Sequence, residues 1–369
     1  MRRATLLIVL CLGLALTQIP CADTPANAAT VNIRLGATDG YAIMPDGTAV
    51  YGFGWADLTR VSKKRIYNNK GKAQFIGPLI EVYEGDDVYI TMTNLGMVMR
   101  PDLDDSHTIH WHGFRNQIPI YDGVPEPSIA VPVGRDFVYY YKPLDPGTYM
   151  YHCHFEPVEH IQMGMVGVLI VRPALEKTLK KRKFVFNDTA TEFDREFLVF
   201  VSEIDPVAHH DIESVQEPDW TDYKAGYWVL NGRAYPDTMA PASALPYQPF
   251  NSRIQANAGE KVLLRFMNLG FEQHPLQLLG IPMKVVGMDA QPLKGLNGED
   301  LSVWKSTIYI GAGKTFDVIF QAPNTPGEYP FYNRNYCKQR DGPVGVGGML
   351  TSVVVHSPRT LPGQRAVNE

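Results

Sequence analysis

Six of the ten histidines lie in two short motifs, and one of these motifs also contains a cysteine and a methionine. The motifs are HTIHWHGF (107–114) and YHCHFEPVEHIQMGM (151–165). A soft thiolate, two imidazoles and a thioether together favour copper in a trigonal site with a weak axial ligand. Zinc also accepts cysteine and histidine, but it has no need of the methionine. The predicted ligands of this type 1 (blue) copper are His107, Cys153, His160 and Met165.

The other four histidines of the two motifs are expected on the opposite face of the same strands. Side chains at i and i+2 of a strand share a face, and the one at i+1 points the other way. A lone histidine on a strand is usually a surface or core residue, but four at these parities predict a second metal site. Its ligands would be His110, His112, His152 and His154, and the catalytic bridge between the two sites would be Cys153 with its neighbours His152 and His154.

A methionine-rich and acidic stretch comes just before the first motif. We expect it either to line an approach for a substrate or copper, or to be a plain acidic surface loop. Its residues are Met97, Met99, Asp102, Asp104 and Asp105.

Residues 1–28 have the layout of a cleaved secretory signal. Arg2 and Arg3 precede the apolar run ATLLIVLCLGLAL, and a small-residue site, ANA (26–28), follows it. An uncleaved membrane anchor would need an apolar run of about 18 residues. We therefore predict a periplasmic or extracellular protein with no membrane attachment after cleavage.

Removal of the signal changes the net charge from −5 to −6 and leaves two cysteines, Cys153 and Cys337. A slightly acidic chain without a long basic run makes nucleic acid a poor candidate partner. An exported chain with so few cysteines is not held together by disulfides.

An internal repeat sets the architecture. EVYEGDDVYITMTNLG (81–96) is matched by QANAGEKVLLRFMNLG (255–270), and residues 133–154 are matched by residues 312–334. Each copy alternates apolar and polar residues over short stretches that Gly, Pro, Asn and Asp interrupt. This pattern predicts an all-β fold with two β-sandwich or barrel domains. The predicted segments are a signal at 1–28, domain 1 at 29–173, a charged linker at 174–194, domain 2 at 195–358 and a loose tail at 359–369.

These motifs resemble those of the multicopper oxidases. The resemblance rests on HWHG (110–113), on HCH (152–154) with the His and GM that follow it, and on SEID (202–205), VLNGRAYPDT (229–238) and PGEYPFYNRN (326–335). It spans nearly the whole chain after the signal. It implies two tandem cupredoxin-like Greek-key domains and the type 1 ligands named above. It also implies that His110, His112, His152 and His154 form half of a trinuclear copper cluster, which domain 2 of a neighbouring subunit completes in a homotrimer.

Domain 2 departs from the pattern of that family. At the repeat offsets, His274 and Met349 correspond to His107 and Met165, but Asn333 stands where Cys153 is expected. The four histidines of the second site fall on Gln277, Leu279, Tyr332 and Arg334. The sequence therefore predicts neither a second blue copper site nor an ordinary trinuclear cluster in domain 2.

Three further residues are left as candidates around domain 2. We expect His209 and His210, in the stretch PVAHHDIE, to be exposed loop residues, with a role as extra ligands from a neighbouring subunit as the alternative. We expect Cys337 to be a buried free cysteine that behaves as a small apolar residue, rather than part of a soft site with His274 and Met349.

The leading functional interpretation is a copper oxidoreductase of the multicopper oxidase type. A small reductant (a phenol or a metal ion) or a redox protein would give single electrons to the type 1 copper, and the electrons would pass to the second copper and towards dioxygen. A copper-binding electron-transfer protein without turnover is the alternative that the depleted domain 2 favours. A nitrite-reductase-like trimer is the third, although that family places an aspartate where His110 stands.

Overall fold

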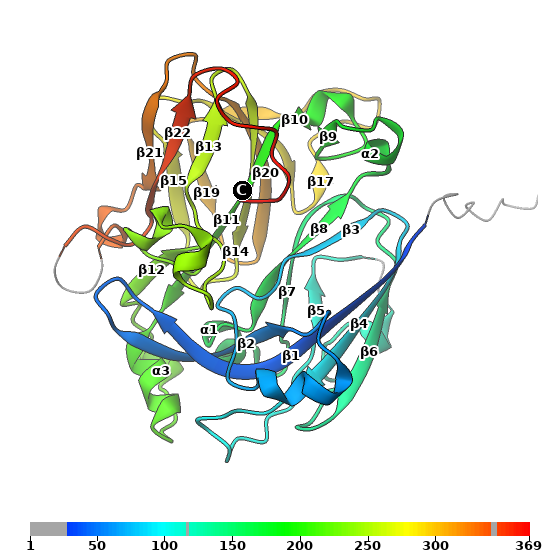
Figure 1. The fold of residues 1–369 in the computed structure, drawn as a ribbon, viewed down its shortest axis with the longest axis vertical. Helices are drawn as coiled ribbons and strands as arrows, with labels where there is room; N and C mark the ends of the chain where they lie inside the picture. The colour runs from blue at the N-terminus through cyan, green and yellow to red at the C-terminus, as the bar shows by residue number, and fades with distance from the viewer. Residues whose placement is uncertain (1–27, 116–117, 341–344) are drawn as a thin grey trace, which may run out of the picture.

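The computed structural model describes residues 28–115, 118–340 and 345–369, so the predicted signal lies outside the described residues except for Ala28. Most regular elements are strands, and they form two sandwiches that pack against each other (Figure 1). The prediction of an all-β fold is confirmed. Among the described residues, none of the helices has the length and apolar character needed to cross a membrane.

The first sandwich consists of two four-stranded sheets. One sheet has the order β2-β1-β4-β6, with β1 Thr30–Ile43, β2 Ala49–Asp57, β4 Asp87–Asn94 and β6 Asp136–Tyr141. The other has the order β3-β8-β7-β5, with β3 Ile80–Tyr83, β5 His110–His112, β7 Gly147–His152 and β8 Val166–Arg172. The core between the sheets is rich in aromatic side chains, among them Trp55, Trp111 and Tyr139.

The second sandwich repeats this arrangement. Its first sheet has the order β12-β11-β14-β20-β16-β17, with β18 paired to β16, and its second has the order β13-β22-β21-β15-β19. The bounds of the first sheet are β11 Arg195–Ile204, β12 Tyr227–Leu230, β14 Lys261–Asn268, β16 Met283–Met288, β17 Gln291–Pro292, β18 Val303–Lys305 and β20 Lys314–Gln321. Those of the second sheet are β13 Ile254–Asn257, β15 His274–Leu278, β19 Thr307–Ile310, β21 Gly327–Asn333 and β22 Leu350–His356.

The internal repeat is visible in equivalent strand pairs. β1 pairs with β4 in parallel, as β11 does with β14, and β3 pairs with β8 in parallel, as β13 does with β22. The turns that follow β3 and β13 contain Gly85 and Gly259 at positive φ, 84° and 83°, a backbone region that favours glycine. The matching sequence blocks therefore form matching structural units.

Short elements connect the two sandwiches and fill the loops. In the described part of the chain, the α-helices are α1 Pro157–Gln162, α2 Ala174–Thr178 and α3 Pro206–Glu213. The pair β9 Lys183–Phe184 and β10 Glu192–Phe193 lies in the predicted linker. The 3-10 turns are Lys63–Asn69, Pro119–Tyr121, Thr189–Thr191, Trp220–Asp222, Asp237–Met239, Ala242–Ala244 and Tyr336–Lys338.

The C-terminal tail is not loose, so that prediction is wrong. The side-chain amide of Gln364 bonds reciprocally to the backbone of Glu196, and Asn368 accepts a hydrogen bond from the Leu198 N–H at 2.7 Å. β12 pairs only with residues 201–204 of β11, so the earlier part of β11 has backbone groups available on that side. The tail supplies polar partners to these groups, which buried backbone requires.

Apolar and ionic contacts join the two sandwiches. One buried cluster combines Met150 and Val168 of the first sandwich with Phe200 and Met267 of the second. Beside it, the fully buried carboxylate of Glu196 contacts the guanidinium groups of Arg172 and Arg265, at 2.5 and 3.0 Å. The two halves of the repeat therefore share a continuous interior.

Candidate metal centre

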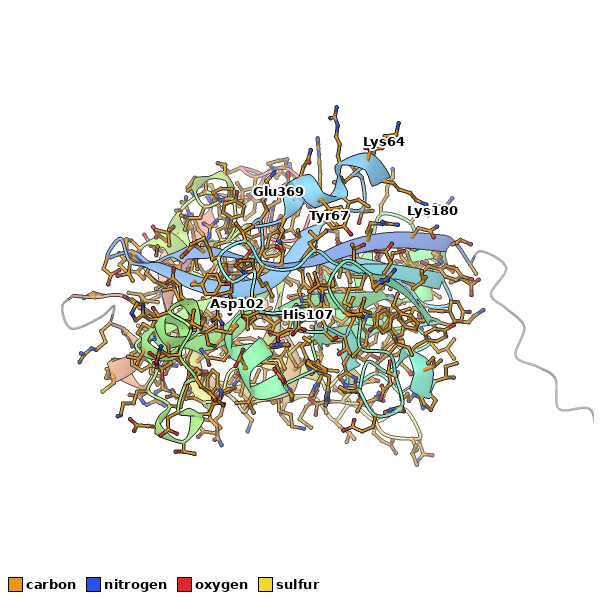
Figure 2. All side chains as sticks on the ribbon, turned by 90° about the horizontal axis from the view of Figure 1, so that it is seen from below. Lys64, Tyr67, Asp102, His107, Lys180 and Glu369 are labelled. Carbon is orange, nitrogen blue, oxygen red and sulfur yellow. The ribbon has the colours of Figure 1, made fainter. Side chains whose placement is uncertain are left out.

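The thiol of Cys153 lies between two imidazoles in the interior of the first sandwich. Cys153 directly follows β7, His107 forms an isolated bridge with Val131, and His160 lies on α1. The Sγ atom is 3.2 Å from Nδ1 of His160 and 3.9 Å from Nδ1 of His107. All three side chains are fully buried. In Figure 2, His107 lies within the outline of the molecule, whereas Lys64 projects beyond it.

The predicted axial ligand lies close by along the chain. The backbone carbonyl of Met165 accepts a hydrogen bond from the Cys153 N–H at 3.1 Å, and its side chain is buried in the same core cluster as Cys153. The loop between them returns through α1, where the N–H of Met165 donates to the carbonyl of His160 at 2.9 Å. The short spacing of the motif therefore brings these three residues to one place.

The residues present fit a type 1 copper. Nδ1 of each imidazole faces the thiol, and the Nε2 atoms of both rings have no hydrogen-bond partner among the described residues. The Thr108 N–H points at Sγ from 3.4 Å, as expected for a group that supports a thiolate. One sulfur and two nitrogens converge in a dry interior, which is the donor set that copper prefers.

The charges of this centre depend on its burial. Burial lowers the pKa of His107 well below the usual range of histidine. Burial also opposes protonation of His160, but the neighbouring Cys153 thiolate and the Asp105 carboxylate outweigh it and raise the pKa of His160 to about 10. A bound cation would therefore replace a proton at His160.

The four remaining motif histidines form a second cluster on the other side of β5 and β7. The two strands are antiparallel, with His110 opposite His152. Nδ1 of His112 lies 3.3 Å from Nε2 of His152, and the ring of His154 is centred 5.1 Å from that of His110. The alternation of side chains along the strands has separated these rings from Cys153.

Neighbouring groups orient this four-histidine cluster, and burial keeps His110, His112 and His152 neutral. Nδ1 of His110 lies 2.6 Å from the carbonyl oxygen of Asp122, a residue that the sequence analysis did not single out. Burial lowers the pKa of His110 and His112, and it lowers the pKa of His152 to about 3. Neutral imidazoles are the form that binds metals. A surface pocket of about 220 Å³ opens beside His112 and is bounded by Asp289 and Lys314 of the second sandwich.

The equivalent of the thiol site in domain 2 is filled by protein groups. The side-chain amide of Asn333 lies 3.0 Å from Nδ1 of His274 and 3.2 Å from the sulfur of Met349. Nζ of Lys338 lies 3.5 Å from the same Nδ1 and 2.5 Å from Glu272, while Glu203 contacts the other nitrogen of His274. An amide and an ammonium thus occupy the place that corresponds to the Cys153 thiol and to the predicted metal position in domain 1.

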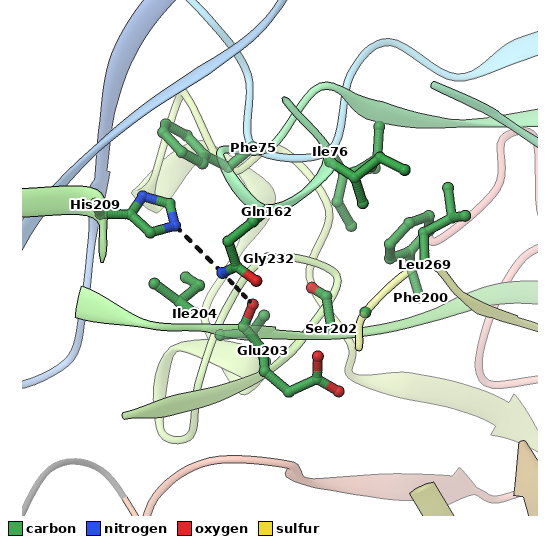
Figure 3. A pocket seen from close by; sticks show the side chains of 15 residues that line it. Phe75, Ile76, Gln162, Phe200, Ser202, Glu203, Ile204, His209, Gly232 and Leu269 are labelled. Atoms are coloured by element: carbon green, nitrogen blue, oxygen red, sulfur yellow. Dashed lines mark hydrogen bonds between the residues drawn. The ribbon is translucent and has the colours of Figure 1, made fainter. Parts of the chain in front are cut away.

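Two expectations for domain 2 are wrong. His209 is buried on α3, where its ring bonds to the carbonyl of Tyr51 and lies beside Gln162 in a pocket of about 40 Å³ between the domains (Figure 3). Asp205 caps the helix by accepting from two backbone N–H groups, so the PVAHHDIE stretch is not a loop. His210 on the same helix is exposed. Cys337 is exposed rather than buried.

The side chains of the acidic stretch before His107 differ in their burial and in their contacts. Met97 is buried in the core and Met99 is half exposed, while both carboxylate oxygens of Asp102 accept hydrogen bonds from Arg100. Asp104 is exposed, whereas Asp105 lies 3.8 Å from Nε2 of His160. Side-chain oxygens of Glu156 and Glu159 lie within 4.8 Å of Asp105 and His160. The sequence analysis missed both, although they stand four and one positions before His160.

Comparison with known proteins agrees with this geometry. Two family models described as multicopper oxidase match residues 56–176 and 209–355. Laccase-1 of Cryptococcus neoformans var. neoformans serotype D (strain B-3501A) is 27% identical over 269 residues, which cover 67% of this chain and 39% of the laccase. Copper resistance protein A of Pseudomonas syringae pv. tomato is 27% identical over 280 residues, 66% and 41% of the two chains. The chain thus spans about two fifths of the length of these relatives.

Solved structures show the same fold. A blue copper oxidase from Nitrosomonas europaea superposes with a TM-score of 0.68 at 24% identity, covering 88% of this chain and 86% of the other. A copper nitrite reductase from Nitrosomonas europaea superposes with a TM-score of 0.60 at 20% identity, and the match covers 89% of this chain and 94% of the reductase. The two family matches together span most of both sandwiches and include all eight motif residues, from His107 to Met165. The chain is therefore a member of the multicopper oxidase family, and copper is its cofactor.

Proposed function

We propose that this protein is an oxidoreductase that takes single electrons from a reductant at His107, Cys153, His160 and Met165 and passes them to a second copper on the four-histidine cluster. The observation that carries the proposal is the covalent link between the two clusters. Cys153 is flanked in the chain by His152 and His154, whose rings belong to the four-histidine cluster. A copper ion in each place would supply one-electron redox chemistry. The reductant would be a phenol, a metal ion or a redox protein, and dioxygen the final acceptor.

The protein residues have defined parts in this scheme. Burial of the thiol and of its two imidazoles excludes water and fixes the donor atoms before the metal binds. The backbone of Asp122 holds one ring of the second cluster by a short contact with Nδ1 of His110. Most of these donors lie on, or next to, paired strands, whereas His160 lies on α1.

We further propose that the protein acts outside the cytoplasm and as a homotrimer. The predicted signal supports export, and the open pocket beside His112 supports completion of the four-histidine cluster by another subunit. A nitrite-reductase-like activity is less well supported, because His110 occupies the position where that family has an aspartate.

A second candidate function is a copper carrier without turnover. It is favoured by domain 2, where Asn333 and Lys338 fill the equivalent of the type 1 site and no histidines replace those of the second cluster. Copper analysis with electron paramagnetic resonance (EPR) of the purified protein distinguishes the two functions. We expect at least two coppers per chain and both type 1 and type 2 signals. One copper per chain with a type 1 signal alone would support the carrier instead.

The variant Cys153→Ser tests the ligand assignment. Loss of the thiolate should abolish the blue absorption and reduce electron transfer to the second copper by at least a hundredfold, a loss of about 2.7 kcal/mol of barrier stabilisation. Cys337→Ser is the matched control, because this exposed cysteine lies far from the cluster in the chain and is not part of it. It should retain full colour. Retention of the blue colour in Cys153→Ser would show that the ligands are assigned wrongly.

A further inference from the structure

The helix that carries the predicted copper ligand His160 makes a direct polar contact with domain 2. Gln162 is the last residue of α1, two positions after His160, and its side chain is buried. Its Nε2 donates a hydrogen bond to the backbone carbonyl of Glu203 at 3.0 Å and lies 3.4 Å from Nε2 of His209. Glu203 belongs to β11 and His209 to α3, and Figure 3 shows the Gln162 amide joined to both. The two N–H groups of one amide thus meet two acceptors of the other domain.

The contacts of His209 define which of its ring nitrogens carries the proton. Nδ1 bonds to the backbone carbonyl of Tyr51 on β2, and a carbonyl oxygen can only accept, so Nδ1 is the protonated nitrogen. Burial lowers the pKa of His209, which keeps the ring neutral. Nε2 then has a free lone pair and accepts from the Gln162 amide. His209 therefore connects two parts of domain 1, β2 and α1, through a helix of domain 2.

Strand β2 also packs directly on the loop that holds the ligands. The Phe53 N–H donates to the carbonyl of Met163 at 2.9 Å, and the Phe53 ring meets that of His160 edge-on, with 5.8 Å between the centroids. Two glycines allow this approach. A Cβ at Gly52 would lie 2.5 Å from the carbonyl oxygen of Met163, and one at Gly164 would lie 2.9 Å from that of Phe53. The backbone on both sides of α1 is therefore closely fitted to β2.

The contact between the domains lies in an interior with little room for water. The cavity beside Gln162 and His209 has a volume of about 40 Å³, and its walls include the apolar side chains of Ile76, Phe200 and Leu269. A buried amide or imidazole that loses its partner in such a place is not compensated by solvent. The pair of hydrogen bonds therefore favours a single position of α1.

We propose that Gln162 and His209 are positioning residues for the type 1 copper, through which domain 2 holds α1 and the His160 imidazole in place. The inference rests on the proposed function, because it assumes copper at the Cys153 cluster. Groups outside the ligand set influence the affinity and the electronic structure of a metal site by fixing its ligands. Domain 2 would thus support the copper site of domain 1, although Asn333 stands where a second thiolate would be needed.

The variants Gln162→Leu and His209→Phe test this role in the purified holoprotein. Both keep the approximate size of the side chain and remove its polar atoms. We expect the blue absorption to disappear roughly tenfold faster in the presence of excess copper chelator, because a supporting contact of the site is lost. The copper hyperfine splitting in the EPR spectrum should also change. The variant His210→Phe makes the same substitution at an exposed position of α3 and should behave like wild type.

The double variant Gln162→Leu/His209→Phe shows whether the two residues act as one unit. Its copper release should be no faster than that of the faster single variant, since each change already breaks the shared contact. Independent, multiplying accelerations would overturn the inference. A wild-type EPR spectrum in folded Gln162→Leu would overturn it as well, even with faster release, because the ligands would then not have moved.

The experiment remains decisive if His209→Phe does not fold. Gln162→Leu leaves α3 and its contact with Tyr51 unchanged, so its EPR spectrum and its rate of copper release then decide alone. Absence of blue colour in the wild-type protein would refute the proposed function rather than the positioning role.

Discussion

At the scale of single residues, the chemistry depends on the alternation of side chains along one short segment. His152, Cys153 and His154 are consecutive, yet the thiol is fully buried with His107 and His160 while the flanking rings meet His110 and His112. Strand geometry alone predicts this separation from the sequence. The contribution of Asp122 could not be predicted in the same way, because it acts through its backbone carbonyl.

The lowered pKa values of His107, His110, His112 and His152 predict how the metal-free protein responds to acid. In the unfolded chain a histidine takes up a proton near pH 6.5, but His152 in the folded state does so only near its pKa of about 3. The folded state therefore loses stability as the pH falls from about 6.5 towards 3. Denaturant unfolding of the metal-free protein at pH 7.5 and pH 5 should show a lower free energy of unfolding at pH 5.

The variant His152→Gln isolates this contribution. It removes one titrating group that burial keeps neutral, so the fall in stability between pH 7.5 and pH 5 should be smaller than in wild type. An identical fall in the two proteins would mean that His152 is protonated as readily in the folded chain as in the unfolded one.

At the scale of elements, the internal repeat predicted the strands better than it predicted the loops. The matching blocks formed equivalent parallel pairs, β1–β4 and β11–β14, because apolar alternation and turn residues are local properties. The α3 segment was misinterpreted, although an aspartate followed by proline is a recognised helix start. The proximity of Asp105 to Glu156 and Glu159 was not predicted, because these residues come together only when the loop before His107 meets α1.

The filled site of domain 2 predicts that two substitutions can create a blue copper site there. Nδ1 of His274 and the sulfur of Met349 already converge on the Asn333 amide, and Lys338 lies on the same side. In the double variant Asn333→Cys/Lys338→His, we expect one additional copper per chain and about twice the blue absorption. The measurement is copper content with visible spectroscopy.

The single variant Lys338→His is the control for this rebuilding, since it retains the amide in place of a thiolate. It should gain no blue absorption. If the double variant also gained none while remaining folded, the backbone of domain 2 would have moved too far from the geometry of domain 1 to hold copper.

At the scale of the whole molecule, the two sandwiches should unfold together. The carboxylate of Glu196 lies where the domains meet. Burial alone would raise its pKa, but the guanidinium groups of Arg172 and Arg265 outweigh burial and lower the pKa to about 2. Removing one partner of a buried ion pair typically costs ~3–5 kcal/mol, because the remaining charges stay buried. We expect Glu196→Gln to lower the free energy of unfolding by about this amount, measured by denaturant titration.

Glu192→Gln is the corresponding surface control. Its carboxylate contacts Arg182 at 2.5 Å, but the Arg182 side chain is 46% exposed, and exposed pairs contribute about 1 kcal/mol or less. A similar loss in both variants, or two separate unfolding transitions in wild type, would show that the buried network does not couple the domains.

The opposite environments of Cys153 and Cys337 have a practical consequence. Cys153 is sealed in the core, whereas Cys337 is exposed beside the filled site of domain 2. A thiol-reactive fluorophore or spin label should therefore attach selectively at Cys337 in the folded protein. In the proposed homotrimer, such a reporter would allow distances between subunits to be measured in solution while the proposed copper ligands of domain 1 remain chemically untouched.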